Sequence, residues 1–265
     1  MRPDRPPEVA PGDGEIPRRG MLTLALDSST ATLSLAIVEW GDGAKVLAEA
    51  TPDDGGRHGE ALPGAIDRLL AGAGLSLSDL DGCAVGLGPG SFTGLRVGLA
   101  TLKGLCYARR LPLAGVSSLR ALAAGAAAAA AGDVVFCPLL DARRGEVYAG
   151  LFRGPAAEPL VPEVALPPSA IEGWLAATGL RARVLGEGLH AYRAALAAPL
   201  GDAADFDLPP RPSAVPIALL AGPPSAFHPA SLFSIEPSYV RLSEAETKHP
   251  EGTFVPHPSL SPRDP

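Results

Sequence analysis

The chain has 265 residues, of which 46% are hydrophobic and 19% are charged, so it is long enough to bury one large core or two of ordinary size. Its formal net charge is -7 and no stretch concentrates Lys and Arg, which excludes autonomous nucleic-acid binding through many phosphate contacts. We therefore expect any contact with RNA to be made through a partner.

The two ends of the chain differ from its middle in composition. Residues 1–20 are rich in Pro, Gly and charges of both signs, and they lack the apolar stretch of a secretory signal. Residues 243–265 are also poor in apolar side chains, so we expect both segments to be disordered. The Ala-rich run at 119–131 is shorter than a bilayer span. We therefore expect a cytoplasmic protein without membrane contact.

The cysteines carry no metal-ligand spacing such as a C-x-x-C pair. All three stand in apolar surroundings: Cys83, Cys106 and Cys137. We expect buried free thiols in a reducing compartment.

The first part of the folded region alternates between strand and helix patterns. Residues 33–38 alternate at the strand period of two, and the helical stripe within 91–109 is Leu95, Leu99, Leu102 and Cys106. The expected strands are 22–27, 32–39, 44–50, 83–87 and 112–116. The expected helices are 60–71, 91–109 and an Ala-rich helix capped by Ser117 or Ser118. The order is therefore βββαβα, followed by βα.

The second part repeats this order more weakly. Two strand-like runs, 134–141 and 146–152, are joined by a hairpin at 142–145. An S-x-x-E capping box at Ser169 opens a helix to Thr178, and a strand at 183–186 precedes a helix at 189–198. The repeat predicts an α/β protein with two duplicated βββαβα lobes of the ribonuclease-H type, at 21–118 and 119–242.

A polar turn follows the first strand. Asp27, Ser28, Ser29 and Thr30 would present hydroxyls and backbone N–H groups to a phosphate, with Asp27 available for a hydrated Mg²⁺. Side-chain turns of the Asx and Ser/Thr types explain the same residues without a ligand. Both interpretations stay open at this point.

A second, glycine-rich turn precedes the helix at 91–109. Gly88 and Gly90 permit unusual backbone angles, and Ser91 stands where a helix cap belongs, which is typical of an anion site. No Lys follows as in a P-loop, so the turn does not establish nucleotide chemistry. Gly94 and Gly98, continued by Thr101, place small residues on one side of the helix. That side either packs on the sheet of its own lobe or contacts another subunit.

Four motifs together resemble the TsaB (YeaZ) family. They are Leu26-Asp27-Ser28-Ser29-Thr30, the stretch from Gly88 to Gly98, the stretch from Asp141 to Tyr148, and Glu236-Pro237-Ser238-Tyr239-Val240-Arg241. The resemblance spans Met21 to about Arg241. It implies an actin-like ASKHA fold and a role in making threonylcarbamoyladenosine in tRNA.

The resemblance also implies a division of labour among subunits. The transferase is the paralogue TsaD, which this chain would bind, stabilise and activate. A P-loop ATPase, TsaE, completes the complex, and tRNA is reached through the complex alone. The resemblance also implies a homodimer when the chain is alone. The implied partner interface is Gly90, Ser91, Phe92, Thr93, Gly94, Leu95, Arg96, Gly98 and Thr101.

The sequence itself agrees with a non-catalytic role. The resemblance places Ser118 and Leu122 where the catalytic paralogue has its two metal-binding histidines, and an aliphatic carbon cannot ligate a metal. The remaining histidines are dispersed, so we expect no metal site and no cofactor held by this chain alone. An independent ASKHA-type ATPase or metallopeptidase-like enzyme is the alternative.

A last polar cluster lies at the second-half hairpin, formed by Asp141, Arg143 and Glu146 with Tyr148. Asp141 and Arg143 would close the hairpin with an ion pair. The two-lobed fold implied by the resemblance places this hairpin at the inter-lobe cleft. There Asp141, Arg143 and Glu146, with Asp27, Ser28 and Ser29, form a candidate vestigial nucleotide site for ATP or ADP with Mg²⁺ at the complex interface.

Overall fold

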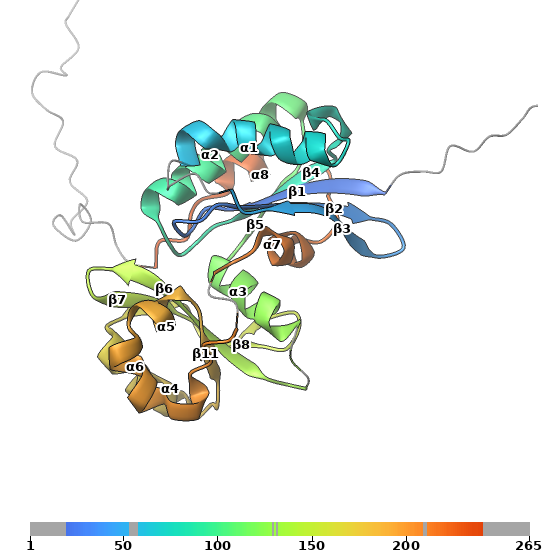
Figure 1. The fold of residues 1–265 in the computed structure, drawn as a ribbon. Coiled ribbons are helices and arrows are strands. Elements are labelled where there is room, and N and C mark those ends of the chain that lie inside the picture. Colours follow the sequence, from blue (N-terminus) through green and yellow to red (C-terminus); the bar gives the residue numbers. More distant parts are fainter. Residues whose placement is uncertain (1–19, 53–57, 129, 131, 209–210, 241–265) are drawn as a thin grey trace, which may run out of the picture.

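The computed structural model describes residues 20–52, 58–128, 130, 132–208 and 211–240. Two lobes, each built around a β-sheet, make up this part of the chain (Figure 1). The disorder expected for 1–20 and 243–265 falls outside the described residues, apart from Gly20.

The first sheet has the strand order β3-β2-β1-β4-β5, with β1 pairing antiparallel to β2 and parallel to β4. Its strands are β1 (Met21–Asp27), β2 (Ser34–Trp40), β3 (Ala44–Ala50), β4 (Gly82–Gly86) and β5 (Leu113–Val116). The helices in this stretch are α1 (His58–Gly72), the 3-10 turn η1 (Leu77–Asp79), α2 (Phe92–Arg109) and α3 (Ser118–Ala127). The expected βββαβα order followed by βα is confirmed.

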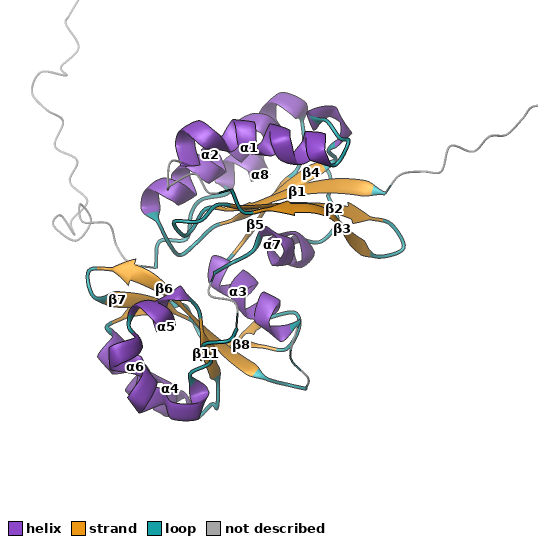
Figure 2. Ribbon diagram, in the orientation of Figure 1, coloured by secondary structure: helices purple, strands orange, loops and turns teal. Residues whose placement is uncertain are grey.

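Both faces of the first sheet are covered. Helices α1, α2 and α8 (Pro229–Ser234) lie on one face, and α7 (Ala214–Ala221) lies on the other (Figure 2). Residues 33–38 are consequently all buried, because Leu35 and Ile37 pack under α1 and α2 whereas Ala36 and Val38 pack on α7. The alternating residues of this strand therefore point to two different faces of the sheet, and both faces are buried; neither is exposed to solvent.

The second sheet is centred on β6. Its strands are β6 (Val135–Arg143), β7 (Glu146–Ala149), β8 (Phe152–Arg153), β9 (Glu158–Pro159), β10 (Val164–Leu166) and β11 (Arg183–Leu185). The helices of this lobe are η2 (Pro168–Ala170), α4 (Ile171–Thr178), α5 (Glu187–Ala191), α6 (Arg193–Leu200) and η3 (Gly201–Ala203). Helices α4, α5 and α6 cover one face of β6, and α3 covers the other.

The second sheet repeats the topology of the first. Strands β7 and β8 pair with β6 in one antiparallel register, so together they take the place of β2. Strand β11 runs parallel to β6 as β4 does to β1, and β10 is antiparallel to β7 as β3 is to β2. Within the described residues, only an isolated parallel bridge between Val184 and Ala204 corresponds to β5. The predicted duplication is therefore confirmed.

Two local expectations in the second lobe are wrong. Ser169 does not cap α4, because it lies inside the 3-10 turn and Ala170 precedes the helix without a side-chain cap. The helix expected at 189–198 is divided at Tyr192, whose backbone angles of φ -110° and ψ 28° lie outside the helical region. Ser117, in contrast, accepts a hydrogen bond from the backbone N–H of Arg120 and caps α3 as expected.

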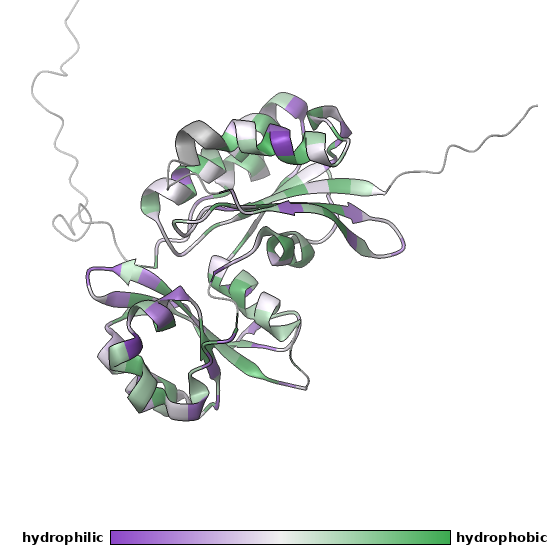
Figure 3. Ribbon diagram, in the orientation of Figure 1, coloured by the Kyte–Doolittle hydropathy of each residue, from purple (hydrophilic) through white to green (hydrophobic). Residues whose placement is uncertain are grey.

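The last helices of the two halves are exchanged between the lobes. Helix α3 ends the first half but packs on the second sheet, against Phe136 and Leu140. Helix α7 ends the second half but packs on β1, β2 and β4 of the first sheet, and it is apolar along its length (Figure 3). Residues 214–234, which the sequence alone places in the second lobe, thus lie with the first sheet, because α7 and α8 supply apolar cover for both of its faces.

Within the described residues, no helix combines the length and apolar character needed to cross a bilayer.

Candidate functional site

The polar turn after β1 is buried inside the first lobe. Asp27, Ser28, Ser29 and Thr30 are each less than 5% exposed. The Oδ1 atom of Asp27 accepts hydrogen bonds from the backbone N–H of Ser29 at 3.0 Å and from its hydroxyl at 2.6 Å. Its Oδ2 atom accepts a hydrogen bond from the Ser118 hydroxyl at 2.6 Å, and Ser28 donates to the carbonyl of Gly94 at 2.9 Å.

These contacts decide between the two interpretations of this turn. Burial raises the pKa of Asp27, and the hydrogen bonds from Ser118 and Ser29 oppose that shift in part. Both carboxylate oxygens are occupied by groups of the same chain, so the residues do not form an open cradle for a phosphate or for Mg²⁺. The turn is a structural element that joins β1 to the start of α3.

The glycine-rich turn closes over the same loop. Gly88 has a φ of +90°, and a Cβ at this position would lie 2.6 Å from a methyl group of Leu95, so the turn needs glycine here. Its N–H donates to the Ser118 hydroxyl at 3.1 Å, and Ser91 donates its N–H to the carbonyl of Ser29 at 2.6 Å. The Ser91 hydroxyl accepts from the N–H of Gly94, which confirms the predicted cap of α2.

Gly94 and Gly98 face the interior of their own lobe. A Cβ on Gly94 would lie 2.2 Å from the carbonyl oxygen of Ser28, and one on Gly98 would lie 2.3 Å from the Ser28 hydroxyl. Leu95 is also buried, at 2% exposure. The interpretation of Gly94, Leu95 and Gly98 as partner-contacting residues is therefore wrong. Their small size lets α2 approach the loop after β1.

The opposite side of α2 is exposed. Of the expected interface residues, Ser91, Phe92, Thr93 and Arg96 are exposed, and Gly90 and Thr101 are half-buried. Further along, the exposed residues of α2 are Ala100, Gly104, Tyr107, Ala108 and Arg109. A Cβ added at Gly104 would meet no atom within 4 Å. A row of small side chains therefore does face outward, at Ala100, Gly104 and Ala108.

Aromatic side chains flank this row. Phe92 lies 5.6 Å from Tyr239 and Tyr107 lies 5.7 Å from Phe233, measured between ring centroids. The Cζ atom of Arg96 stands 3.7 Å from the centroid of the Phe92 ring. We call the exposed residues of α2, together with Phe233 and Tyr239, the α2 face.

The sequence contained a partial signal for the rest of the α2 face. Tyr107 lies off the stripe of buried leucines, so helical periodicity places it on the outer side. No sequence pattern predicts that Phe233 belongs to this face, because α8 is far from α2 in the chain and meets it only in the folded structure.

The second-lobe cluster is separate from the turn after β1. Asp141 forms an ion pair with Arg143 at 3.3 Å and accepts hydrogen bonds from the Arg143 N–H at 2.9 Å and from the Tyr192 hydroxyl at 3.1 Å. In the described part of the chain, no hydrogen bond or ion pair joins Asp141 or Arg143 to Asp27. The ion pair closes the hairpin, as expected.

The two positions that the resemblance aligns with the paralogue's metal-binding histidines are also occupied by structural side chains. Ser118 is fully buried and bonded to Asp27 and Gly88, and Leu122 is 1% exposed in the core under α3. Among the described residues, no three His, Cys, Asp or Glu side chains are grouped so that they could hold a metal ion. The three cysteines are buried and unpaired, as expected, and burial raises the pKa of Cys137 to about 12.

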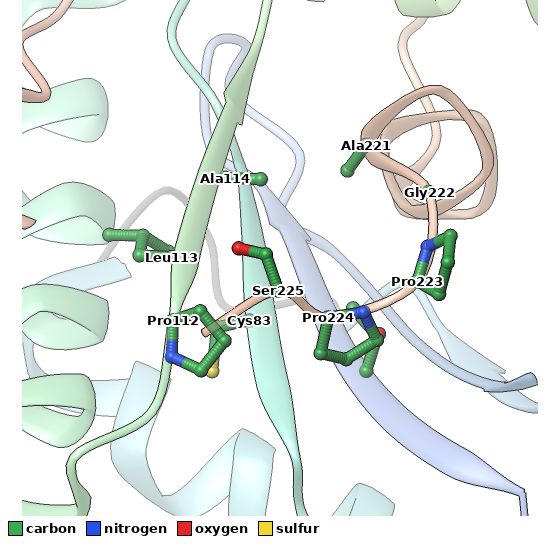
Figure 4. Close-up of a pocket in the computed structure, with 10 residues that line it drawn as sticks. Cys83, Pro112, Leu113, Ala114, Ala221, Gly222, Pro223, Pro224 and Ser225 are labelled. Carbon is green, nitrogen blue, oxygen red and sulfur yellow. The ribbon is translucent and has the colours of Figure 1, made fainter. Parts of the chain in front are cut away.

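A cavity of about 80 Å³ lies at the other end of the first sheet (Figure 4). It is bounded by the starts of β4 and β5 and by the segment after α7, including Pro112, Pro224 and Ser225. Ligand pockets usually measure about 300–1,000 Å³. The cavity is therefore too small for a nucleotide, and it lies away from Asp27 and Gly88 at the carboxyl ends of β1 and β4.

Known proteins resemble this chain along most of its length. A family model, TsaD: tRNA N6-adenosine threonylcarbamoyltransferase, matches residues 51–182. The tRNA threonylcarbamoyladenosine biosynthesis protein TsaB of Bacillus subtilis is 31% identical over 239 residues, which are 86% of this chain and 97% of that protein. The TsaB protein of Escherichia coli is 37% identical over 129 residues, 48% of this chain and 53% of its own.

The fold has the same relatives. A crystal structure of a Pseudomonas aeruginosa protein, described as similar to peptidase YeaZ, matches with a TM-score of 0.65 and 27% identity, over 83% of this chain and 100% of that one. With the duplicated lobes, this match confirms the expected actin-like ASKHA fold.

Proposed function

Because the chain belongs to the TsaB family, we propose that it is the non-catalytic subunit of a complex that makes tRNA threonylcarbamoyladenosine, and that it binds and activates a TsaD-like transferase through the α2 face. One observation supports the choice of this face. Of the seven large hydrophobic side chains that are exposed among the described residues, four lie on it: Phe92, Tyr107, Phe233 and Tyr239. Exposed apolar side chains gathered on one surface are typical of a protein interface.

The occupant that we propose has the same fold as this chain. The TsaD family model matches residues 51–182, a range that includes all of α2. The row of Ala100, Gly104 and Ala108 would let a helix of the transferase approach closely, and the aromatic rings would surround that contact. A second copy of this chain would use the same surface, so a homodimer would compete with the heterodimer.

The side chains at the two positions aligned with the paralogue's histidines support a non-catalytic role. Ser118 is committed to Asp27 and Gly88, and Leu122 has no donor atom. We propose that ATP or ADP with Mg²⁺ is held by the transferase or by a TsaE-like ATPase and not by Asp27, whose carboxylate is occupied. The net charge of -7 supports the proposal that tRNA is reached through the partner.

The test compares two glycines that both stand in open space on helices. Gly104 lies in the middle of the α2 face, whereas Gly173 lies on α4 of the second lobe, and an added Cβ would meet nothing within 4 Å at either position. Gly104→Leu should weaken binding to the purified transferase at least about ten-fold, because the new side chain holds the two surfaces apart. Gly173→Leu should bind as the unaltered chain does.

Thermal unfolding of both variants checks that the fold is intact. Threonylcarbamoyladenosine in tRNA, measured by mass spectrometry in cells that carry each variant in place of the unaltered chain, gives the functional result. The modification should fall with Gly104→Leu and persist with Gly173→Leu. Equal binding by the two variants would show that the α2 face is not the docking surface. Unaltered modification in cells that lack the chain would contradict the role in the pathway.

A further inference from the structure

The segment that follows α8 crosses from one lobe to the other. We call residues 235–240 the strap. Ile235 packs against the core of the first lobe. The N–H of Ser238 donates to the carbonyl of Leu87 at 2.7 Å, at the point where β4 enters the glycine-rich turn. Val240 packs against the second-lobe cluster that contains Leu140 and Tyr148. The strap is thus attached to both lobes on either side of Tyr239.

Between these attachments, Tyr239 contacts the guanidinium of Arg96 on the α2 face. The Nε atom of Arg96 donates to the Tyr239 hydroxyl at 3.1 Å, and the Arg96 Cζ lies 5.9 Å from the centroid of the Tyr239 ring. The guanidinium also lies over the ring of Phe92, with its Cζ 3.7 Å from the ring centroid. All three side chains are exposed, so the arrangement is not a consequence of core packing.

The way Arg96 is held determines what remains available for binding. Its Nε donates to Tyr239, whereas neither terminal nitrogen donates a hydrogen bond to another of the described residues. Two parallel N–H groups on a fixed guanidinium match the two oxygens of a carboxylate. A long side chain that is already ordered loses less conformational entropy when a partner binds.

We propose that Tyr239 is a positioning residue that presents Arg96 to an Asp or Glu carboxylate of the transferase, with the strap fixing Tyr239 relative to both lobes. The inference rests on the proposed function, because it names the chemistry of one contact within that docking surface. Arg96 supplies the contact itself, and Tyr239 acts through Arg96.

The test compares small substitutions at Tyr239 and Arg96 with a matched change outside the α2 face. Tyr239→Phe removes the hydroxyl that orients Arg96 and keeps the ring. Tyr192→Phe is the matched control, because it removes a hydroxyl that donates to Asp141 in the second lobe, outside the α2 face. Arg96→Lys keeps the charge and loses the paired N–H groups. The dissociation constant for the purified transferase is measured for each variant at several salt concentrations, with thermal unfolding as a check of the fold.

We expect Tyr239→Phe to weaken binding roughly three- to ten-fold, which is the cost of ordering one long side chain during binding. Arg96→Lys should weaken it about ten-fold or more with a similar dependence on salt, because the charge is kept while the two parallel N–H bonds to the carboxylate are lost. Tyr192→Phe should leave the affinity unchanged. The double variant Arg96→Lys with Tyr239→Phe should bind like Arg96→Lys alone, since the tyrosine acts through the arginine.

Two results would overturn the inference while leaving the docking surface in place: Tyr239→Phe with unaltered affinity, or additive losses in the double variant. Failure of the unaltered chain to bind the transferase would instead overturn the proposed function, and this inference with it.

Discussion

Asp27 has a carboxylate, which often binds metal ions in proteins, but here the side chain stabilises the fold through hydrogen bonds within the chain. Its carboxylate is 1% exposed and receives three hydrogen bonds from Ser29 and Ser118. Burial nevertheless outweighs these bonds and raises its pKa. In the folded chain the carboxyl group therefore retains its proton at pH values where the unfolded chain has already lost it.

The raised pKa predicts a pH dependence of stability. Between about pH 4, the ordinary pKa of Asp, and the raised pKa, the folded state binds more protons than the unfolded state, so this group's contribution to stability falls as the pH rises. Asp27→Asn cannot ionise, and its amide can donate to Ser118 in place of the present bond. Its free energy of unfolding in urea should therefore increase relative to the unaltered chain from pH 4 to pH 8.

The exposed Asp67 provides the control for this measurement, since Asp67→Asn makes the same substitution at a carboxylate on the surface. A constant difference between Asp27→Asn and the unaltered chain across the range would show that Asp27 does not titrate in the way its burial implies.

At the scale of elements, α2 and α7 each have one side packed in the core and another side exposed. Helix α2 directs its leucines and Gly94 inward and its small and aromatic residues outward. Helix α7 lies between the first sheet and α3, with Ile217 and Ala218 fully buried and Leu219 46% exposed. In both helices the direction of each side chain, and not its hydrophobicity, decides its role.

Two neighbouring residues of α7 provide a matched test of this point. Ile217→Ala should lower the free energy of unfolding by about 2–5 kcal/mol, because it leaves a cavity between α7 and the first sheet. Leu219→Ala should change it by less than about 0.5 kcal/mol. Urea unfolding of the two variants gives the comparison, and a similar loss in both would contradict the placement of α7.

At the scale of the whole molecule, each lobe depends on a helix from the other half of the chain. Helix α7 covers the face of the first sheet that lies opposite α1 and α2, and this face is formed by Ala25, Ala36, Val38 and Ala84. The second lobe depends in turn on α3, because Arg120 of this helix donates to the carbonyls of Ala156 and Ala157 and the hydroxyl of the capping Ser117 donates to Glu163. The lobes are therefore not independent folding units.

This dependence predicts the behaviour of a fragment. Residues 21–118 produced alone should not unfold cooperatively in urea and should bind a hydrophobic dye, because the face that α7 covers is then exposed to water. Joining residues 211–240 to this fragment through a flexible linker should restore a cooperative transition. A sigmoidal transition for 21–118 alone would show that α7 is dispensable for the first lobe.

The elements of the first half follow from local signals. Period-two and helical patterns, the Gly41-Asp42-Gly43 turn and the caps at Ser91 and Ser117 involve residues close in the chain, so the sequence predicts these strands and helices to within a few residues. The hairpin at 142–145 was predictable for the same reason. The division at Tyr192 was not, because its backbone angles carry no signal in the composition of the helix.

The sequence by itself determined the order of elements, the duplication, the family and the absence of histidines at the positions of the metal ligands. The tertiary structure decided which side of α2 is exposed, what surrounds Asp27 and where α7 packs. Periodicity shows which residues share a face, but it does not identify the neighbour of that face. Gly94 and Gly104 have the same side chain, and only the position of Ser28 against one of them makes the first structural and leaves the second available to a partner.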